Sequence, residues 1–541
     1  MRIALAQINT TLADFKLNKE KILDCVHQAH QRKCDMVVLP ECALFGYHPF
    51  DLLERKKLVS QQEAELKDII KKIPKDIAVI FGLITKNPDK KGRPYFNSAV
   101  MLAKGTKPRY FHKQLLPTGD VFDEARFIEP GDVSQNYFQW KNKKFFLTIC
   151  EDIWAWPDKK GHAPYKVNPL AKVKKKKIDM VINLSASPYF VGKMKQREYV
   201  TTQTAAYFNA PMMYVNLVGA QDEIIFDGAS FVIDKKGKKL LTCQSFKEDI
   251  NVIDIDSGEI WNKTKPLSVI EELRQALVLG IQDFCGKTGI KKVHLGLSGG
   301  IDSAVVAALA VDALGPANVA GIGLPGPFNA SESLTLAKQL AKNLGITFKT
   351  VSIDGMFKKV VEALEEGIEL KEFGLVHENL QARLRGLSLM AYSNKENSML
   401  LTTGNKSEYA TGYTTMYGDM CGGLAPLGDL TKEQVYALAE YYNQQDELIP
   451  KRIITRPPSA ELRPDQKDQD SLPPYADLDK SVVYLVEKSG EAKTKTDHWL
   501  LPILMRTEFK RWQAPPILKV SQHSFGRGRR YPIAHRAHEI K

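Results

Sequence analysis

The sequence predicts an α/β protein of two domains. Its 541 residues exceed what one hydrophobic core usually organises, about 250–300 residues. Short apolar strand patterns alternate with helical patterns along the chain. A polar stretch that carries Gly258 and Pro266 separates two regions of different patterning. We therefore expect domains at residues 1–255 and 269–541, joined by a linker at 256–268.

The composition is ordinary for a soluble, globular chain. Hydrophobic residues make up 43% and charged residues 26%, and no run of 18 apolar residues predicts a membrane span. Residues 1–9 are typical of a strand and not of a signal peptide. Seven cysteines without a CxxC pair favour a reducing cytoplasm over a disulfide framework or a zinc site.

A net charge of +13 raises the question of nucleic-acid binding. The densest basic run, residues 172–177, contains no aromatic side chain, so we interpret it as a solvated helix face. Small anionic substrates such as ATP explain a basic balance as well as RNA does. We expect no nucleic-acid partner and no membrane association.

Six apolar runs in the first domain are predicted strands, at 3–8, 36–39, 78–82, 97–102, 145–149 and 180–184. Helical stretches lie between the first of them, and paired strands dominate the middle, which indicates a layered α/β fold. Three residues with reactive side chains come just after apolar strand patterns, namely 36–39, the run at 108–111, and 145–149. They are Glu41, Lys113 and Cys150.

A thiol, a carboxylate and an ammonium are the parts of an amide-cleaving site. A cysteine with a pKa of about 8.5 is a poor nucleophile until a base takes its proton. A lysine aimed at the carbonyl oxygen stabilises the oxyanion. The pattern alone leaves the plainer interpretation open, because a strand-end cysteine is usually a small buried hydrophobe.

Four segments carry a family resemblance, at 39–47, 113–127, 150–154 and 183–189. They closely resemble the nitrilase, or carbon–nitrogen hydrolase, superfamily over roughly residues 1 to 255. The resemblance implies an α-β-β-α sandwich that cleaves amides through a thioester. It makes Glu41 the base, Lys113 the oxyanion stabiliser and Cys150 the nucleophile.

The same resemblance implies a glutamine site. Ser187 and Lys193 match positions that bind the substrate. The family usually has a tyrosine six residues after the catalytic lysine, and here that position is Gly119. We therefore expect the role of the tyrosine to pass to another residue or to the backbone at Gly119.

The second domain contains a glycine-rich loop between a strand at 292–295 and a helix at 304–314. Such a strand–loop–helix junction binds anions through free N–H groups and the helix dipole. Hydroxyl groups of Ser298 and Ser303 add donors, and Asp302 beside phosphates needs a divalent cation such as Mg²⁺ between them. The candidate ATP residues are Gly296, Leu297, Ser298, Gly299, Gly300, Ile301, Asp302 and Ser303.

Strand and helix patterns alternate around this loop, at 269–284, 319–324, 331–344 and 347–351, and predict a doubly wound parallel sheet. We interpret Gly286-Lys287-Thr288 as a surface turn, because its spacing from Gly280 does not fit a phosphate loop. Residues 459–479 read as a long loop that closes over substrate.

The glycine-rich loop resembles that of the ATP pyrophosphatases, which have an adenine nucleotide α-hydrolase-like fold. Four further segments, at 378–385, 401–408, 418–419 and 508–516, resemble the glutamine-dependent NAD synthetase family over nearly the whole chain. The resemblance implies that Thr403 also holds ATP and that Asp302 and Glu408 hold Mg²⁺. It assigns Asn379, Glu408 and Lys510 to deamido-NAD.

The family's activity joins the two domains. Glutamine hydrolysis releases ammonia, ATP adenylylates deamido-NAD with release of pyrophosphate, and ammonia then yields NAD and AMP. We expect a homo-oligomer, at least a dimer. The alternatives are another acceptor, such as a purine nucleotide or a tRNA base, and a basic nucleic-acid-binding protein with a vestigial amidase.

Overall fold

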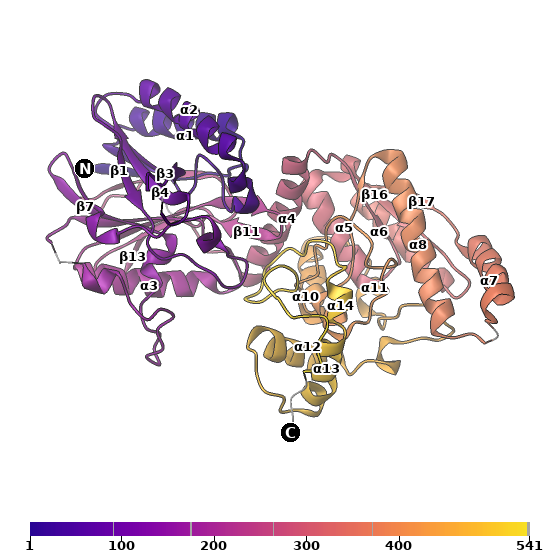
Figure 1. The fold of residues 1–541 in the computed structure, drawn as a ribbon. Coiled ribbons are helices and arrows are strands. Elements are labelled where there is room, and N and C mark those ends of the chain that lie inside the picture. Colours follow the sequence, from indigo (N-terminus) through magenta and orange to yellow (C-terminus); the bar gives the residue numbers. More distant parts are fainter. Residues whose placement is uncertain (90, 174–175, 263, 371, 538–541) are drawn as a thin grey trace. The chain divides into compact units, whose positions relative to one another are not determined.

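The computed structural model describes residues 1–89, 91–173, 176–262, 264–370 and 372–537. The chain divides into two compact units, Met1–Ser268 and Val269–Lys541 (Figure 1). We describe each by itself. Within the described ranges, no helix is both long and apolar enough to cross a membrane.

The described residues of the first unit form two six-stranded sheets and three α-helices. The first sheet has the order β14-β1-β2-β3-β4-β5, and the second has the order β13-β12-β9-β8-β7-β6. The first sheet consists of β1 (Arg2–Gln7), β2 (Met36–Val38), β3 (Ala78–Lys86), β4 (Tyr95–Ala103), β5 (Arg109–His112) and β14 (Asp249–Asp254). The second consists of β6 (Tyr137–Trp140), β7 (Lys143–Ile149), β8 (Met180–Ser185), β9 (Met212–Asn216), β12 (Phe231–Ile233) and β13 (Lys239–Thr242). A separate hairpin joins β10 (Val218–Gln221) to β11 (Ile224–Asp227), and the helices are α1 (Phe15–Gln31), α2 (Lys56–Lys72) and α3 (Lys193–Phe208).

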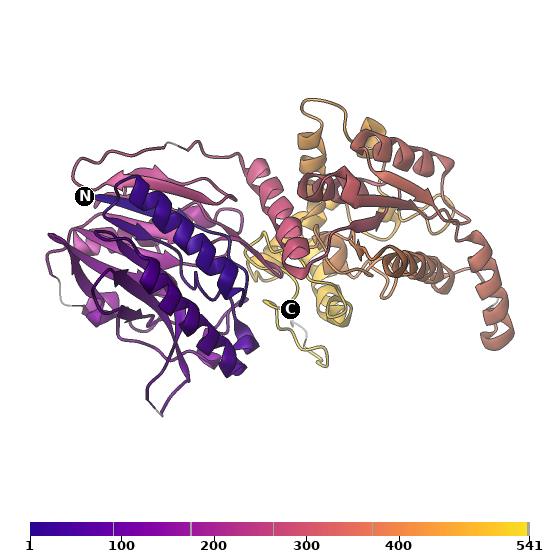
Figure 2. The same ribbon diagram turned by 90° about the horizontal axis from the view of Figure 1, so that it is seen from above.

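Alternation along the strands explains the layers of this unit. In β1, Ile3 and Leu5 lie in the core between the two sheets, whereas Ala4 and Ala6 lie in the core under α1 and α2. The second sheet buries its other face against α3 through residues such as Phe146 and Val200. Helices thus cover the outer faces of both sheets, and the predicted α-β-β-α sandwich is confirmed (Figure 2).

The second unit is built on a parallel sheet of order β17-β16-β15-β18. Its strands are β15 (Val293–Gly296), β16 (Val319–Gly323), β17 (Thr347–Thr350) and β18 (Met399–Leu400). The helices of the unit are α4 (Val269–Thr288), α5 (Ile301–Leu314), α6 (Ser331–Leu344), α7 (Asp354–Ile368), α8 (Leu375–Glu396), α9 (Lys406–Thr411), α10 (Lys432–Tyr442), α11 (Lys451–Thr455), α12 (Tyr475–Val482), α13 (Lys495–Arg506) and α14 (Glu508–Arg511). Both α5 and α8 contact β15, and the predicted parallel α/β fold is confirmed.

Three local predictions differ from the structure. Gly286-Lys287-Thr288 is the last turn of α4 and not a surface turn, because the helix continues until Gly289, whose φ of +77° ends it. The predicted long loop at 459–479 already contains the start of α12. In the basic run, Lys172 ends a single 3₁₀ turn, Val173 is buried, and Lys176 and Lys177 are exposed coil. The described lysines are therefore solvated but do not form an α-helical face, and Lys174 and Lys175 lie outside the described residues.

Candidate active sites

A buried ammonium between two carboxylates forms the centre of the first unit. The Lys113 Nζ atom lies 2.8 Å from Oε1 of Glu41 and 2.8 Å from Oε1 of Glu124. All three side chains are buried. The structure therefore brings the predicted Glu41 and Lys113 together and adds Glu124, to which the sequence had given no role.

A tight turn places the predicted nucleophile. Cys150 begins the 3₁₀ turn Cys150–Ile153 at the end of β7, with a φ of +42° that only a surrounding hydrogen-bond network sustains in a residue with a Cβ. The Asp152 carboxylate accepts the N–H groups of Ile149, Gln114 and Leu115, each at 2.9 Å. It thereby ties the nucleophile's turn to the residues that follow Lys113.

Burial and charge divide the roles of the two carboxylates. Burial raises the pKa of Glu41, although Lys113 opposes the shift. Burial also acts to raise the pKa of Glu124, but the charges and hydrogen bonds of its partners, Lys113 foremost, outweigh it and lower the pKa. Burial and the charge of Glu41 raise the pKa of Cys150, so the thiol keeps its proton at rest. Lys113 thus contacts both carboxylates, and the raised pKa makes Glu41 the better proton acceptor of the two.

The predicted glutamine residues lie in different settings. The Ser187 hydroxyl accepts from Nε of the buried Arg197 at 3.1 Å. Lys193 is the first residue of α3, and its ammonium lies 3.9 Å from the centre of the Trp154 ring. Gly119 is exposed, and a Cβ added there meets no atom within 4 Å, so it contributes backbone only.

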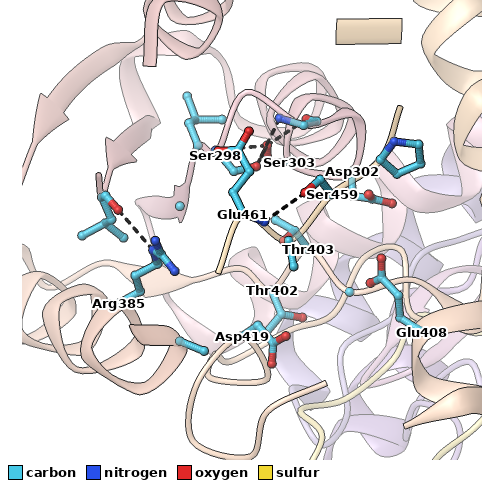
Figure 3. Close-up of a pocket in the computed structure, with 18 of the residues that line it drawn as sticks. Ser298, Asp302, Ser303, Arg385, Thr402, Thr403, Glu408, Asp419, Ser459 and Glu461 are labelled. Atoms are coloured by element: carbon cyan, nitrogen blue, oxygen red, sulfur yellow. Dashed lines mark hydrogen bonds between the residues drawn. The ribbon is translucent and has the colours of Figure 1, made fainter. Parts of the chain in front are cut away.

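A cavity of about 300 Å³ lies at the carboxyl end of the parallel sheet in the second unit. Figure 3 shows Ser298, Asp302 and Ser303 on one side of it and Thr402, Thr403 and Glu408 on another. Seven of the eight predicted loop residues line it, namely Gly296, Leu297, Ser298, Gly300, Ile301, Asp302 and Ser303. The local sequence thus placed both the loop and Thr403 at one cavity.

Gly299 is the loop residue that does not line the cavity. Its φ is +77°, and an added Cβ would lie 2.4 Å from the carbonyl oxygen of Ser333 at the start of α6. The absent side chain therefore makes room for the backbone of α6. Gly300 adopts a φ of −94°, and an added Cβ there meets only the Ser298 hydroxyl, at 3.2 Å.

A lysine joins the two predicted magnesium ligands. Lys432 at the start of α10 forms an ion pair with Asp302, and its Nζ atom lies 3.6 Å from Glu408. Burial, together with the charge of Asp302, raises the pKa of Glu408 to about 8. The raised pKa means that one ammonium does not balance the negative charges of Asp302 and Glu408. A divalent ion beside phosphates commonly uses one or two carboxylates, so these two side chains fit such an ion. Nowhere in the described chain do three or more His, Cys, Asp or Glu side chains form a metal cluster.

The predicted deamido-NAD residues Asn379 and Lys510 do not line the cavity themselves. Both hold the segment 412–419 beside it. Asn379 accepts from the Thr415 hydroxyl at 2.7 Å, and the Lys510 ammonium donates to the carbonyl groups of Gly412 and Thr414, each at 2.7 Å.

Several cavity residues had no role in the sequence interpretation. Arg385 of α8 donates to the Leu324 carbonyl at 3.1 Å, and burial lowers its pKa to about 10. Asp419 also lines the cavity, and desolvation by the protein around its carboxyl group raises the pKa to about 6. The carboxylate of Glu461 accepts from the Ser333 hydroxyl at 2.6 Å and so holds the segment around it at the cavity wall. Two of them lie in segments that carry the family resemblance, Arg385 in 378–385 and Asp419 in 418–419, whereas Glu461 lies in none.

Each of the two units matches a known protein family. The carbon–nitrogen hydrolase family model matches residues 2–262, and the NAD synthase family model matches residues 273–512. A glutamine-dependent NAD(+) synthetase of Synechocystis sp. is 44% identical over 99% of this chain and 99% of its own length. One of Acinetobacter baylyi is 36% identical over 98% of each chain.

Solved structures give the same result. The glutamine-dependent NAD⁺ synthetase of Acinetobacter baumannii, in complex with adenosine diphosphate, covers 98% of each chain with a TM-score of 0.77 and 33% identity. A glutamine-dependent NAD(+) synthetase from Cytophaga hutchinsonii, 22% identical, shares the fold with a TM-score of 0.81 over 99% of this chain and 98% of its own. This chain therefore belongs to the glutamine-dependent NAD(+) synthetase family.

Proposed function

We propose that this protein is a ligase that makes NAD from deamido-NAD, ATP and L-glutamine. One observation carries the proposal: a single chain holds a buried cysteine centre with a carboxylate base and, in its other unit, a strand–loop–helix nucleotide cavity. The first provides ammonia and the second provides an acceptor activated by ATP.

In the first unit, Glu41 takes the thiol proton of Cys150 as the sulfur attacks the amide carbon of glutamine. The Lys113 ammonium, kept charged by Glu124, stabilises the oxyanion. Collapse of the tetrahedral intermediate expels ammonia, to which Glu41 returns the proton, and leaves a thioester. Water, activated by Glu41, then releases glutamate. Ser187 and Lys193 hold the amino acid, with the backbone at Gly119 on the open side.

In the second unit, the carboxylate of deamido-NAD attacks the α-phosphorus of ATP and pyrophosphate leaves. Ammonia then attacks the acyl adenylate, which gives NAD and AMP. The loop from Gly296 to Ser303, with Thr403, binds the phosphates through N–H and hydroxyl groups. Glu408 contacts deamido-NAD in the cavity, and Asn379 and Lys510 support its site through the segment 412–419.

Mg²⁺ is the expected cofactor of this half. Asp302 and Glu408 would hold it, and when bound it would offset the negative charge of the phosphates. The Lys432 ammonium, which already pairs with Asp302, adds a second positive charge at the same place.

The test is NAD formation from deamido-NAD, ATP and magnesium, with glutamine or ammonium as nitrogen donor and with AMP assayed against ADP. We expect NAD and AMP from both donors. Cys150→Ala should abolish the glutamine reaction and leave the ammonium reaction intact. Absence of NAD with both donors would contradict the proposal and favour a different acceptor.

We further infer that the protein forms a homo-oligomer in the cytoplasm. One stripe of α8 exposes Val376, Leu387 and Met390, which recur at helical spacing, and such a stripe is typical of a subunit contact. All seven cysteines lie in the described residues and none forms a disulfide, which suits a reducing compartment.

A further inference from the structure

The loop after the nucleophile's turn buries one side chain among exposed neighbours. Residues 157–164 and 166–167 are exposed, whereas Tyr165 between them is partly buried. An exposed loop gains little core packing from a single inserted ring. The position of Tyr165 therefore needs another explanation.

The loop is held in place at both its tip and its base. At the tip, the Asp158 carboxylate accepts the N–H groups of Lys160 at 2.8 Å and His162 at 2.9 Å. At the base, the Tyr199 hydroxyl of α3 donates to the carbonyl oxygen of Pro157 at 2.8 Å. These bonds shape the loop without using Tyr165.

The Tyr165 hydroxyl reaches the nucleophile's own turn. It donates to Oε1 of Glu151 at 2.7 Å, and Glu151 directly follows Cys150. Burial and the negative charge of Glu151 raise the pKa of Tyr165, so the phenol keeps the proton that it donates. Tyr165 thus fixes the orientation of a carboxylate one residue from the reacting sulfur.

Charges of both signs lie around this turn. Burial raises the pKa of Glu151, while the Tyr165 hydroxyl and the ammonium groups of Lys113 and Lys193 oppose the shift. Glutamine carries an α-ammonium and an α-carboxylate, and each needs a partner of opposite charge when it leaves water. Lys193 suits the carboxylate, and Glu151 is the matching anion for the ammonium.

We propose that Tyr165 determines the specificity of the amidase site for α-amino acid amides, because its hydroxyl positions Glu151 to receive the α-ammonium. This inference rests on the proposed glutaminase function.

The test compares hydrolysis of glutamine with that of glutaramate, which is glutamine without its α-amino group. In Tyr165→Phe, we expect kcat/KM for glutamine to fall about tenfold or more, mainly through KM, because a hydrogen bond to a charged group is lost. Hydrolysis of glutaramate should not change. The control is Tyr199→Phe, which removes a hydroxyl from the base of the same loop and should preserve the ratio between the two substrates.

A second variant separates positioning from folding. Glu151→Gln should cause the same selective loss, and the double variant should lose little more, since both changes remove one interaction. Equal losses for both substrates, or an unchanged ratio in Tyr165→Phe, would overturn the inference. Ammonium-dependent NAD formation by the same wild-type preparation tests the proposed function separately.

Discussion

At the scale of single residues, the side chains around Lys113 set the pKa values of the two carboxyl groups in the cysteine centre. An ammonium between two buried carboxylates cannot pair equally with both while one of them acts as a base. The raised pKa of Glu41 and the lowered pKa of Glu124 support the proposed roles, in which Glu41 accepts the proton and Glu124 keeps Lys113 charged.

Removal of the negative charge at Glu124 should slow glutamine hydrolysis. In Glu124→Gln, Lys113 loses one of its two anionic partners and pairs more strongly with Glu41, which weakens the base and misplaces the oxyanion stabiliser. We expect kcat for glutamine hydrolysis to fall by about 10²-fold, measured as glutamate release. The control is Glu129→Gln, a carboxylate that binds the Arg93 N–H. An activity equal to that of the control would contradict the role of Glu124.

The pH dependence of glutamine hydrolysis should report Glu41. The base works only when it is deprotonated, so kcat/KM should decrease as the pH falls through its pKa. Because burial raises that pKa, the decrease should begin above the ordinary carboxyl range of about 4–4.5. A profile of kcat/KM against pH checks this. Activity that stays flat down to that range would count against Glu41 as the base.

At the scale of elements, the strand–loop–helix junction of β15 and α5 depends on a close approach by α6. The two adjacent glycines of the loop play unequal parts. Gly299 has a positive φ and touches the Ser333 backbone, whereas Gly300 has an ordinary φ and more space.

The two glycines form a matched pair for substitution. Gly299→Ala should disturb the loop, since the methyl group meets backbone and the left-handed φ costs an L-residue about 1–2 kcal/mol. NAD formation should fall with both nitrogen donors, while glutamine hydrolysis continues. Gly300→Ala should have the smaller effect. The KM for ATP and the melting temperature of both variants measure this, and equal effects would argue against the contact with α6.

At the scale of the whole molecule, each unit has its own hydrophobic core and its own chemistry. The core between the sheets serves the cysteine centre, and the parallel sheet of the second unit serves the nucleotide cavity. The exposed stripe of α8 is the proposed contact between chains.

A charge on the exposed stripe of α8 should weaken the proposed oligomer. Leu387 is 62% exposed and Met390 is 40% exposed, so a substitution there should leave the fold intact. We expect Leu387→Glu to lower the mass measured by sedimentation, because burial of a carboxylate in a contact is costly. Leu17→Glu, at an exposed leucine of α1, is the control. An unchanged mass in Leu387→Glu would place the contact elsewhere.

The sequence by itself determined the fold class and the local positions of the reactive residues. Glu41, Lys113 and Cys150 follow apolar strands, and the loop from Gly296 to Ser303 joins a strand to a helix, so short-range patterns were enough to find them. Such patterns also predicted the parallel sheet, because strands and helices alternate at regular intervals.

Only the tertiary structure decided which charges meet. Glu124 pairs with Lys113 across 11 residues, Lys432 meets Asp302 across 130, and Tyr165 reaches Glu151 across 14. Glu124, Lys432 and Tyr165 have no local pattern that marks them, since a charged or aromatic residue outside a strand is most often solvated. Their partners are set by how turns and sheets pack, and burial then fixes the charge that each one carries.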